Sequence, residues 1–198
     1  MKRICTFMLS ALALPLSLSA QTTTPPTGYK MVWSDEFNGT SLDTKVWNIE
    51  ENGNGGGNQE LQYYRKENVA VANGNLVLTA RRENYNNKQF TSGRINSRDK
   101  AYFKHGIIQA RIKFPKTANG VWPAYWMMGN DYGKLGWPRC GEIDIVETGN
   151  AEGIKNGTQT RHFGATLHWG TSAGANHKQY GTSYLAPENN PLQNDEYH

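Results

Sequence analysis

The stretch Gly141-Glu142-Ile143-Asp144-Ile145-Val146-Glu147 interleaves acidic residues with β-branched ones, a composition that favours a β-strand. Side chains on a strand alternate between two faces, so Glu142 and Asp144 share one face and the isoleucines share the other. Glu147 follows Glu142 at an odd offset, which by itself would direct it to the apolar face. A one-residue β-bulge between Asp144 and Glu147 returns it to the acidic face. The stretch therefore predicts three carboxyl groups on one face of a kinked strand.

This spacing has a chemical consequence. With the bulge, the Cα atoms of Glu142 and Glu147 are about 13 Å apart, or about four strand steps. Their long side chains can approach each other, and retaining glycosidases need carboxyl groups about 5–5.5 Å apart. Crowding of the acids makes full ionisation costly, so one of them is expected to keep its proton near neutral pH in a coupled titration. The alternative is an edge strand with a solvated acidic face.

The length, the N-terminal segment and the net charge of the chain indicate what kind of protein it is. Its 198 residues are enough for one domain with a sizeable core. Residues 1–20 are predicted to be a secretory signal, because Lys2 and Arg3 precede an apolar run that is short for a membrane span. Residues 21–28 are predicted to be a linker and 29–198 the domain. Removing the two basic residues of the signal lowers the formal net charge from +4 to +2, too small a surplus to indicate nucleic-acid binding.

The two cysteines do not predict a disulfide. Cys5 lies within the predicted signal, which leaves Cys140 without a partner in the mature chain. Cys140 is interpreted as a small buried residue, with a thiol nucleophile as the alternative.

Short alternating segments and 21 glycines predict an all-β protein, a two-sheet antiparallel β-sandwich. Asn73-Gly74 is a strong signal for a two-residue hairpin turn. No amphipathic helix of ordinary length is predicted. Besides the acidic stretch, the candidate strands are residues 29–37, 68–72, 75–80, 90–97, 106–114, 120–129, 162–169 and a short run near Tyr180.

Trp122 and Trp126 lie on the same face if the strand over residues 120–129 is regular. An aromatic strand is interpreted either as core or as a platform on which the apolar faces of sugar rings stack.

Taken together, the motifs of this chain resemble those of the glycoside hydrolase family 16 β-glucanases, in particular the laminarinase-like branch. The matching motifs, in the family's order, are residues 33–39 (WSDEFNG), 58–64 (NQELQYY), 92–95 (SGRI), 122–129 (WPAYWMMG), 136–138 (GWP), 141–147 (GEIDIVE) and 166–169 (TLHW). The resemblance implies a concanavalin A-like jelly roll whose concave sheet holds a sugar cleft. It also implies hydrolysis of internal β-1,3 linkages, or mixed β-1,3/1,4 linkages, of a glucan by double displacement.

The resemblance also implies roles for individual residues. Glu142 matches the nucleophile, Glu147 the acid/base and Asp144 the assisting carboxylate. The alternative for Arg94 is a surface ion pair, and for His168 a hydrogen-bonded sheet residue. The residues expected to contact substrate are Asn58, Arg94, Trp122, Trp126, Trp137 and His168.

No cofactor or catalytic metal is expected for the chemistry. Some members of the family hold a structural calcium ion near the segment that matches Glu36 to Gly39, where carboxylate and carbonyl oxygens would suit Ca²⁺. A similar site is predicted here.

The last residues, Asn194-Asp195-Glu196-Tyr197-His198, resemble a family motif that lies partway through the domain. The domain is therefore expected to be incomplete at its C-terminus and to lack its last strands. Missing strands would expose sheet edges and apolar faces, so the 198-residue chain alone is expected to fold poorly and to be weakly active.

Three other functions stay open: a galactan hydrolase acting on agarose or carrageenan, a transglycosylase, and a sugar-binding sandwich without catalysis. The expected partner is a β-glucan polysaccharide. The protein is expected to be a monomer secreted to the periplasm or the extracellular space.

Overall fold

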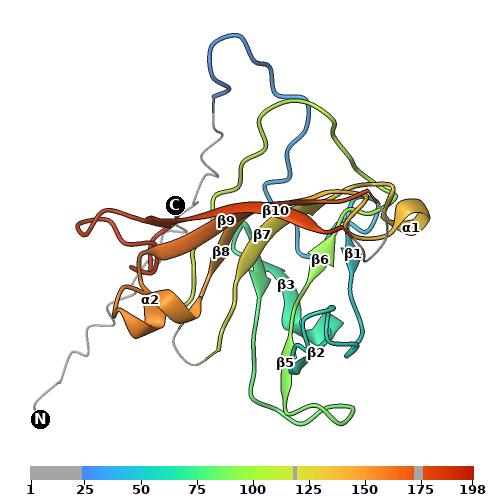
Figure 1. Cartoon of the computed structure of the whole chain (residues 1–198). Helices are drawn as coiled ribbons and strands as arrows, with labels where there is room; N and C mark the ends of the chain where they lie inside the picture. The colour runs from blue at the N-terminus through green and yellow to red at the C-terminus, as the bar shows by residue number, and fades with distance from the viewer. Residues whose placement is uncertain (1–23, 118–119, 172–175) are drawn as a thin grey trace, which may run out of the picture. The chain divides into compact units, whose positions relative to one another are not determined.

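The structure is a computed structural model that describes residues 24–117, 120–171 and 176–198 (Figure 1). The predicted signal and residues 21–23 of the predicted linker lie outside the described residues. The chain divides into two compact units, Met1–Thr44 with Ile49–Ile95, and Lys45–Asn48 with Asn96–His198. Strands β1 (Asn48–Ile49) and β6 (Ile95–Asn96) lie where the chain passes from one unit to the other.

Unit 1 contains a hairpin and a short parallel pair of strands. Strands β3 (Val69–Ala72) and β4 (Asn75–Leu78) are antiparallel, and Asn73 and Gly74 between them have φ values of 52° and 71°. A type I′ turn requires positive φ at both central residues, so the predicted Asn-Gly hairpin is confirmed. After β2 (Gln62–Tyr64), the 3-10 turn η1 (Lys66–Asn68) leads into this hairpin. Strand β2 runs parallel to β5 (Phe90–Ser92).

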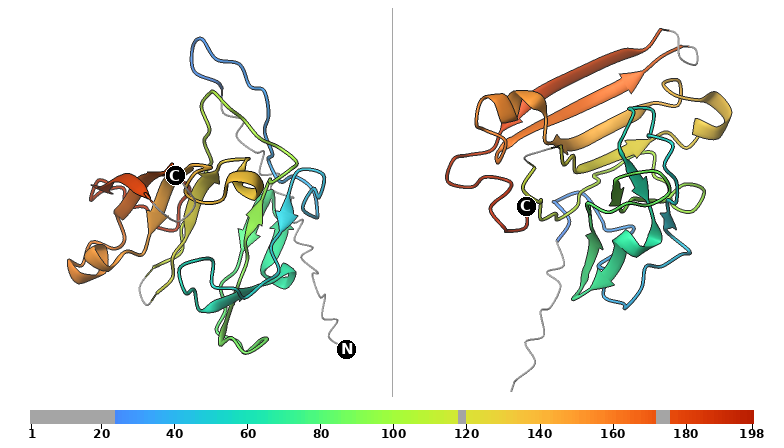
Figure 2. Two further views of the ribbon diagram at one scale, coloured as in Figure 1. Left: turned by 45° about the vertical axis from the view of Figure 1, so that its right-hand side comes forward. Right: turned by 90° about the horizontal axis from the view of Figure 1, so that it is seen from below.

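Unit 2 is built on one antiparallel sheet of four strands in the order β10-β9-β8-β7 (Figure 2). The strands are β7 (Ala124–Met128), β8 (Glu142–Thr148), β9 (His162–Trp169) and β10 (Lys178–Leu185). The α-helices are short, α1 (Tyr132–Leu135) and α2 (Ala151–Lys155), and the all-β class predicted from the sequence is confirmed. No helix in the described ranges is long and apolar enough to cross a membrane.

Two glycines allow close backbone approach around the β7–β8 pair. Gly129 donates its N–H to the carbonyl oxygen of Gly141 at 2.9 Å, and a Cβ at position 129 would lie 1.8 Å from the carbonyl oxygen of Cys140. Gly149 follows β8 with φ +84°, and a Cβ there would lie 2.2 Å from the carbonyl oxygen of Val121. Only glycine fits both positions, so the sequence itself limits where this pair of strands begins and ends.

Two predicted strands are absent. Residues 29–37 are irregular, and at their end the Asp35 carboxylate accepts the N–H of Phe37 at 2.9 Å and Phe37 has φ 50°. Such local side-chain bonds compete with a sheet ladder. Residues 106–114 are irregular as well, although their polar and apolar residues alternate. In this segment Ile112 exchanges both backbone hydrogen bonds with His198, at 2.9 Å each. This pair of hydrogen bonds does not continue into a strand in the described residues.

Two other predictions were too long. The predicted strand at 90–97 is interrupted between β5 and β6, and the one at 120–129 is strand only over β7.

The four-stranded sheet carries an exposed apolar face on the side opposite the acids. The β8–β9–β10 register pairs Ile143 with Leu167 and Leu167 with Tyr180, so these side chains share that face. We call the following exposed residues the apolar sheet face: Ile143, Leu167, Trp169, Tyr180 and Tyr184. Among the described residues, the buried hydrophobic side chains are Val71, Phe114 and Ala186, which do not belong to this sheet.

Candidate active site

Strand β8 brings the three predicted acids onto one face. Glu142 pairs with His168 of β9, Asp144 with Thr166 and Glu147 with Gly164. Between Asp144 and Glu147 β8 advances three residues while β9 advances two, which is the predicted β-bulge. The bulge is confirmed, and Ile145 is the residue of β8 that pairs with neither neighbouring strand.

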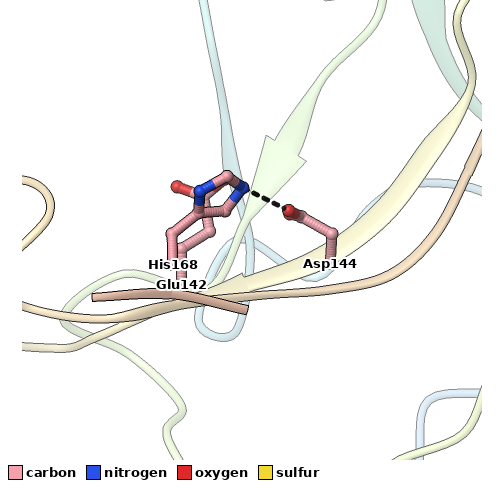
Figure 3. Close-up of side chains that lie close together, drawn as sticks. All are labelled: Glu142, Asp144 and His168. Carbon is pink, nitrogen blue, oxygen red and sulfur yellow. Dashed lines mark ion pairs between the residues drawn. The ribbon is translucent and has the colours of Figure 1, made fainter. Parts of the chain in front are cut away.

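Asp144 is held by His168. Its Oδ2 atom lies 3.1 Å from Nε2 of His168, and the Asp144 side chain is 4% exposed. Figure 3 shows Glu142, Asp144 and His168 projecting from the same side of the sheet. One ligand atom from each of these residues lies within 4.8 Å of the others. His168 is therefore a close neighbour of the acids, and the sheet also pairs it directly with Glu142.

Burial and the other two carboxylates both act on the titration of Asp144. Burial, followed by the negative charges of Glu147 and Glu142, raises the pKa of Asp144 from 3.8 to about 7. A hydrogen bond with the Glu142 side chain acts in the same direction. Asp144 thus keeps its proton over much of the range below neutral pH, as the crowding of the acids predicted.

Glu147 lies beside Trp122. Burial raises the pKa of Glu147, the charge of Glu142 adds to the increase, and a hydrogen bond from the Trp122 side chain opposes it. A raised pKa favours the protonated form, which is what a general acid must supply to a leaving group. The site therefore has two carboxyl groups with raised pKa values, those of Asp144 and Glu147, on the same face as Glu142.

Carboxylate and imidazole groups are also metal ligands. Within the described residues, three side chains of the His, Cys, Asp and Glu types lie close enough together to hold a metal ion, those of Glu142, Asp144 and His168. Metal binding requires deprotonated ligands, and the raised pKa of Asp144 opposes that. We assign no metal here, and the expectation of a metal-free reaction stays a prediction.

The three predicted tryptophan platforms all belong to unit 2. Trp126 is paired with Asp144 across β7 and β8. Trp122 is 50% exposed, and its side chain reaches Glu147. The Trp137 ring lies 5.9 Å from that of His168. Trp122 and Trp126 thus neighbour the acids, and Trp137 neighbours His168 of the same face, in keeping with a sugar platform, although their contact with substrate stays a prediction.

The other two predicted substrate residues, Asn58 and Arg94, belong to unit 1. Asn58 is exposed in a segment rich in glycine and asparagine (residues 52–58), where its N–H donates to the carbonyl oxygen of Gly55 at 2.9 Å. Arg94 forms the ion pair that was its alternative interpretation, with Nε 3.1 Å from Oε1 of Glu50. Their roles in substrate binding stay predictions.

The predicted calcium segment offers few side-chain ligands. In the described part of the chain, no group of three His, Cys, Asp or Glu ligands includes Glu36. The neighbouring Asp35 carboxylate already accepts a backbone N–H, and Gly39 could supply only a backbone carbonyl. Backbone carbonyl oxygens would have to supply most of the ligands, and a structural calcium ion near Glu36 and Gly39 stays a prediction.

The structure favours the interpretation of Cys140 as a residue that is not a nucleophile. Cys140 places its Sγ atom 3.4 Å from Sδ of Met128, and burial raises the pKa of its thiol, which disfavours the thiolate that a nucleophile needs.

His177 was missed by the sequence analysis. It lies directly before β10, two residues ahead of Gln179, which pairs with His168, and its Nε2 atom is 2.9 Å from Nδ1 of His168. A histidine just after a Gly-rich loop that follows a histidine-bearing strand was the available signal.

An antiparallel sheet with grouped carboxyl groups, raised carboxyl pKa values and neighbouring indole rings is the kind of site that glycosidases use. Comparison with known proteins makes the assignment specific. The chain belongs to glycoside hydrolase family 16, in the laminarinase-like branch that its motifs resemble. Residues 9–148 match the model of the beta-glucan synthesis-associated protein family SKN1/KRE6/Sbg1.

Solved structures and a curated relative agree with this assignment. The chain is similar to the Bacteroides ovatus mixed linkage glucan family 16 protein in complex with its G4G4G3G product, with 40% identity and a TM-score of 0.76 over 84% of this chain and 68% of that one. It is similar to the catalytic domain of a laminarinase from Thermotoga petrophila, with 40% identity and a TM-score of 0.72 over 85% of this chain and 67% of that one. A beta-glucanase of Rhodothermus marinus is 40% identical over 153 residues, which are 74% of this chain and 53% of the relative.

These similarities confirm the predicted antiparallel β-sandwich class. The chain spans 21% to 53% of the length of the first curated relatives that it matches.

Proposed function

We propose that this chain carries the catalytic residues of a retaining endo-β-1,3-glucanase, with mixed β-1,3/1,4-glucan as a second substrate. The observation that carries the proposal is the grouping of Glu142, Asp144 and Glu147 on one face of β8, with the pKa of Asp144 raised to about 7. The proposal is supported by two similar proteins, a laminarinase and a mixed linkage glucan hydrolase.

In the proposed reaction, the Glu142 carboxylate attacks the anomeric carbon and forms a glycosyl-enzyme ester. Glu147, protonated at first, gives its proton to the departing glycosidic oxygen as that bond breaks. Glu147 then takes a proton from water, whose oxygen displaces Glu142 from the anomeric carbon and restores both residues. Two inversions leave the configuration at that carbon unchanged.

Asp144 assists without forming a bond to the sugar. While it is protonated, it can donate a hydrogen bond to Glu142, with which its side chain interacts. That hydrogen bond would hold Glu142 in place before attack and stabilise its negative charge. His168 and the indole rings of Trp122, Trp126 and Trp137 are the proposed sugar contacts in unit 2.

The first test compares the chain with Glu142→Gln on three polysaccharides. Reducing-sugar release is measured in parallel on laminarin, lichenan and agarose. We expect hydrolysis of laminarin above lichenan and none of agarose, and a loss of at least about 10³-fold in Glu142→Gln because the nucleophile is gone. The free energy of unfolding should change by no more than about 1 kcal/mol, since the glutamine keeps the shape of the side chain.

Glu152→Gln is the matched control, because it makes the same chemical change at an exposed residue of α2, away from the three acids. It should leave hydrolysis unchanged. Near-normal rates in Glu142→Gln would refute the proposed nucleophile, and release from agarose alone would favour a galactan hydrolase.

Two alternatives use the same sheet. A transglycosylase employs identical residues and passes the glycosyl group to a second sugar, so product analysis at high acceptor concentration distinguishes it. A sugar-binding sandwich needs no group of three acids, and binding of laminarin without oligosaccharide release would favour it. We further infer a secreted protein from the charged and apolar start of the sequence and from the extracellular nature of polysaccharide substrates. The monomeric state stays a prediction.

A further inference from the structure

His168 has a polar partner on each side of its ring. Nε2 lies 3.1 Å from Oδ2 of Asp144, and Nδ1 lies 2.9 Å from Nε2 of His177. Both distances are those of hydrogen bonds. The three side chains therefore form one chain of hydrogen bonds, from an aspartate that is 4% exposed to His177, an exposed residue directly before β10.

The proton positions in this chain depend on one another. A neutral imidazole carries one N–H donor and one acceptor nitrogen, and only one proton fits between the facing nitrogens of His168 and His177. If His177 donates from Nε2, Nδ1 of His168 must accept. His168 then carries its proton on Nε2 and donates it to Asp144. If His177 instead accepts, His168 turns its bare Nε2 toward Asp144, and only a protonated Asp144 can complete that hydrogen bond.

The ring of His177 is held in position by packing. Its centroid lies 4.6 Å from that of Trp137 and 5.1 Å from that of His168, with an interplanar angle of 27° to the latter. The His168 side chain is only 16% exposed, so water has limited access to compete for its nitrogens. Packing and hydrogen bonding together restrain the plane of the His168 ring.

We propose that His177 is a positioning residue that donates a hydrogen bond from Nε2 to Nδ1 of His168, so that His168 presents its Nε2–H to Asp144. The inference rests on the proposed function in one respect, that Asp144 assists the reaction. Through His168, His177 determines how Asp144 is hydrogen-bonded and which way its carboxyl group is turned. The sheet pairs His168 with Glu142 too, so a misplaced His168 ring would disturb both acids. A second partner that orients an active-site histidine is a common device in enzymes.

The test uses the full chain with two substitutions at this position. His177→Phe keeps an aromatic ring against Trp137 but removes the hydrogen bond. His177→Gln restores a donor, because its amide nitrogen can occupy the place of the histidine Nε2 atom. His105→Phe is the matched control, since His105 is an exposed histidine in the irregular segment outside the acidic face.

Two readouts are measured on each protein. The nitrogen-15 NMR shifts of the His168 ring report which nitrogen carries the proton, at about pH 6, where Asp144 is mostly protonated and can complete the hydrogen bond with either tautomer of His168. They should show a protonated Nε2 in the wild type, a mixture of tautomers in His177→Phe and recovery in His177→Gln. On laminarin, kcat should fall about fivefold in His177→Phe, the rate equivalent of one net hydrogen bond, with little change in KM, and should recover in His177→Gln.

An unchanged His168 ring in His177→Phe would overturn the proposal, as would a changed ring with an unchanged kcat or a change that His177→Gln fails to reverse. A wild-type chain that has the expected His168 tautomer but releases no sugar would contradict the proposed function and leave the hydrogen-bond assignment standing.

Discussion

At the scale of single residues, Asp144 carries the clearest electrostatic consequence of the fold. Its pKa of about 7 in the folded chain lies above the ordinary value of 3.8, so the folded state binds a proton that the unfolded state releases. This term favours folding fully below about pH 4 and is lost as the pH rises through the folded pKa near 7. The ionised carboxyl group therefore destabilises the folded chain above neutral pH.

Asp144→Asn should relieve that destabilisation. The amide keeps the size of the side chain but cannot ionise, so the free energy of unfolding should rise relative to the wild type by at least about 1.4 kcal/mol at about pH 8. At about pH 4 the two proteins should differ little, because Asp144 is then protonated. Urea unfolding at both pH values measures this. An equal change at both would mean that the ionisation of Asp144 is not the cause, and laminarin hydrolysis should fall in the variant in either case.

At the scale of secondary-structure elements, the bulge of β8 decides which face each acid occupies. Ile145 is the extra residue, since Asp144 and Val146 pair with the adjacent residues Trp126 and Tyr125 of β7. Side chains alternate along a regular strand, so removing Ile145 would leave Glu147 on the acidic face of an unbulged strand. Removing Ile143 would instead send Glu142 to the opposite face from Asp144.

These two deletions test the register directly, because each removes one isoleucine from the same strand. Deletion of Ile145 should keep a folded chain and lower laminarin hydrolysis by up to about 10²-fold, through displacement of Glu147. Deletion of Ile143 should lower hydrolysis by at least about 10³-fold and cost more stability, because it also breaks the pairing of Ile143 with Met127 and Leu167. Circular dichroism and thermal unfolding serve as folding controls. Greater activity after deletion of Ile143 would contradict the described register.

At the scale of the whole molecule, exposed apolar area is the main feature. The apolar sheet face presents aromatic and aliphatic side chains on three neighbouring strands, with Tyr180 69% exposed. Strand β10 lies at the edge of its sheet, and all eight of its residues are exposed. Exposed apolar faces and unpaired strand edges promote association. The apolar sheet face and the β10 edge are therefore expected to promote self-association of the chain.

Replacing two paired residues of this face should reduce association. Leu167→Thr combined with Tyr180→Thr places β-branched residues, which suit strands, at both positions, and it should lower the binding of the dye ANS and the light scattering of the chain. The free energy of unfolding should change by no more than about 0.5 kcal/mol, as is usual for surface positions. Val77→Thr with Leu78→Thr is the matched control in β4, outside the apolar sheet face, and should leave scattering nearly unchanged. Equal effects of both pairs would mean that association does not depend on this face.

The sequence by itself determined the features that depend on neighbouring residues. Alternation and odd spacing predicted the acidic face and the bulge, Asn73-Gly74 predicted the hairpin, and the ordered motifs indicated the family. The acidic face, the bulge and the hairpin follow from backbone geometry over a few residues, whereas the family was indicated by resemblance. Burial of Asp144 and the contact between His168 and His177 were decided only by the tertiary structure. So were the ion pair of Arg94 and the absence of a strand at 106–114, since each depends on partners far away in the chain or on removal from water.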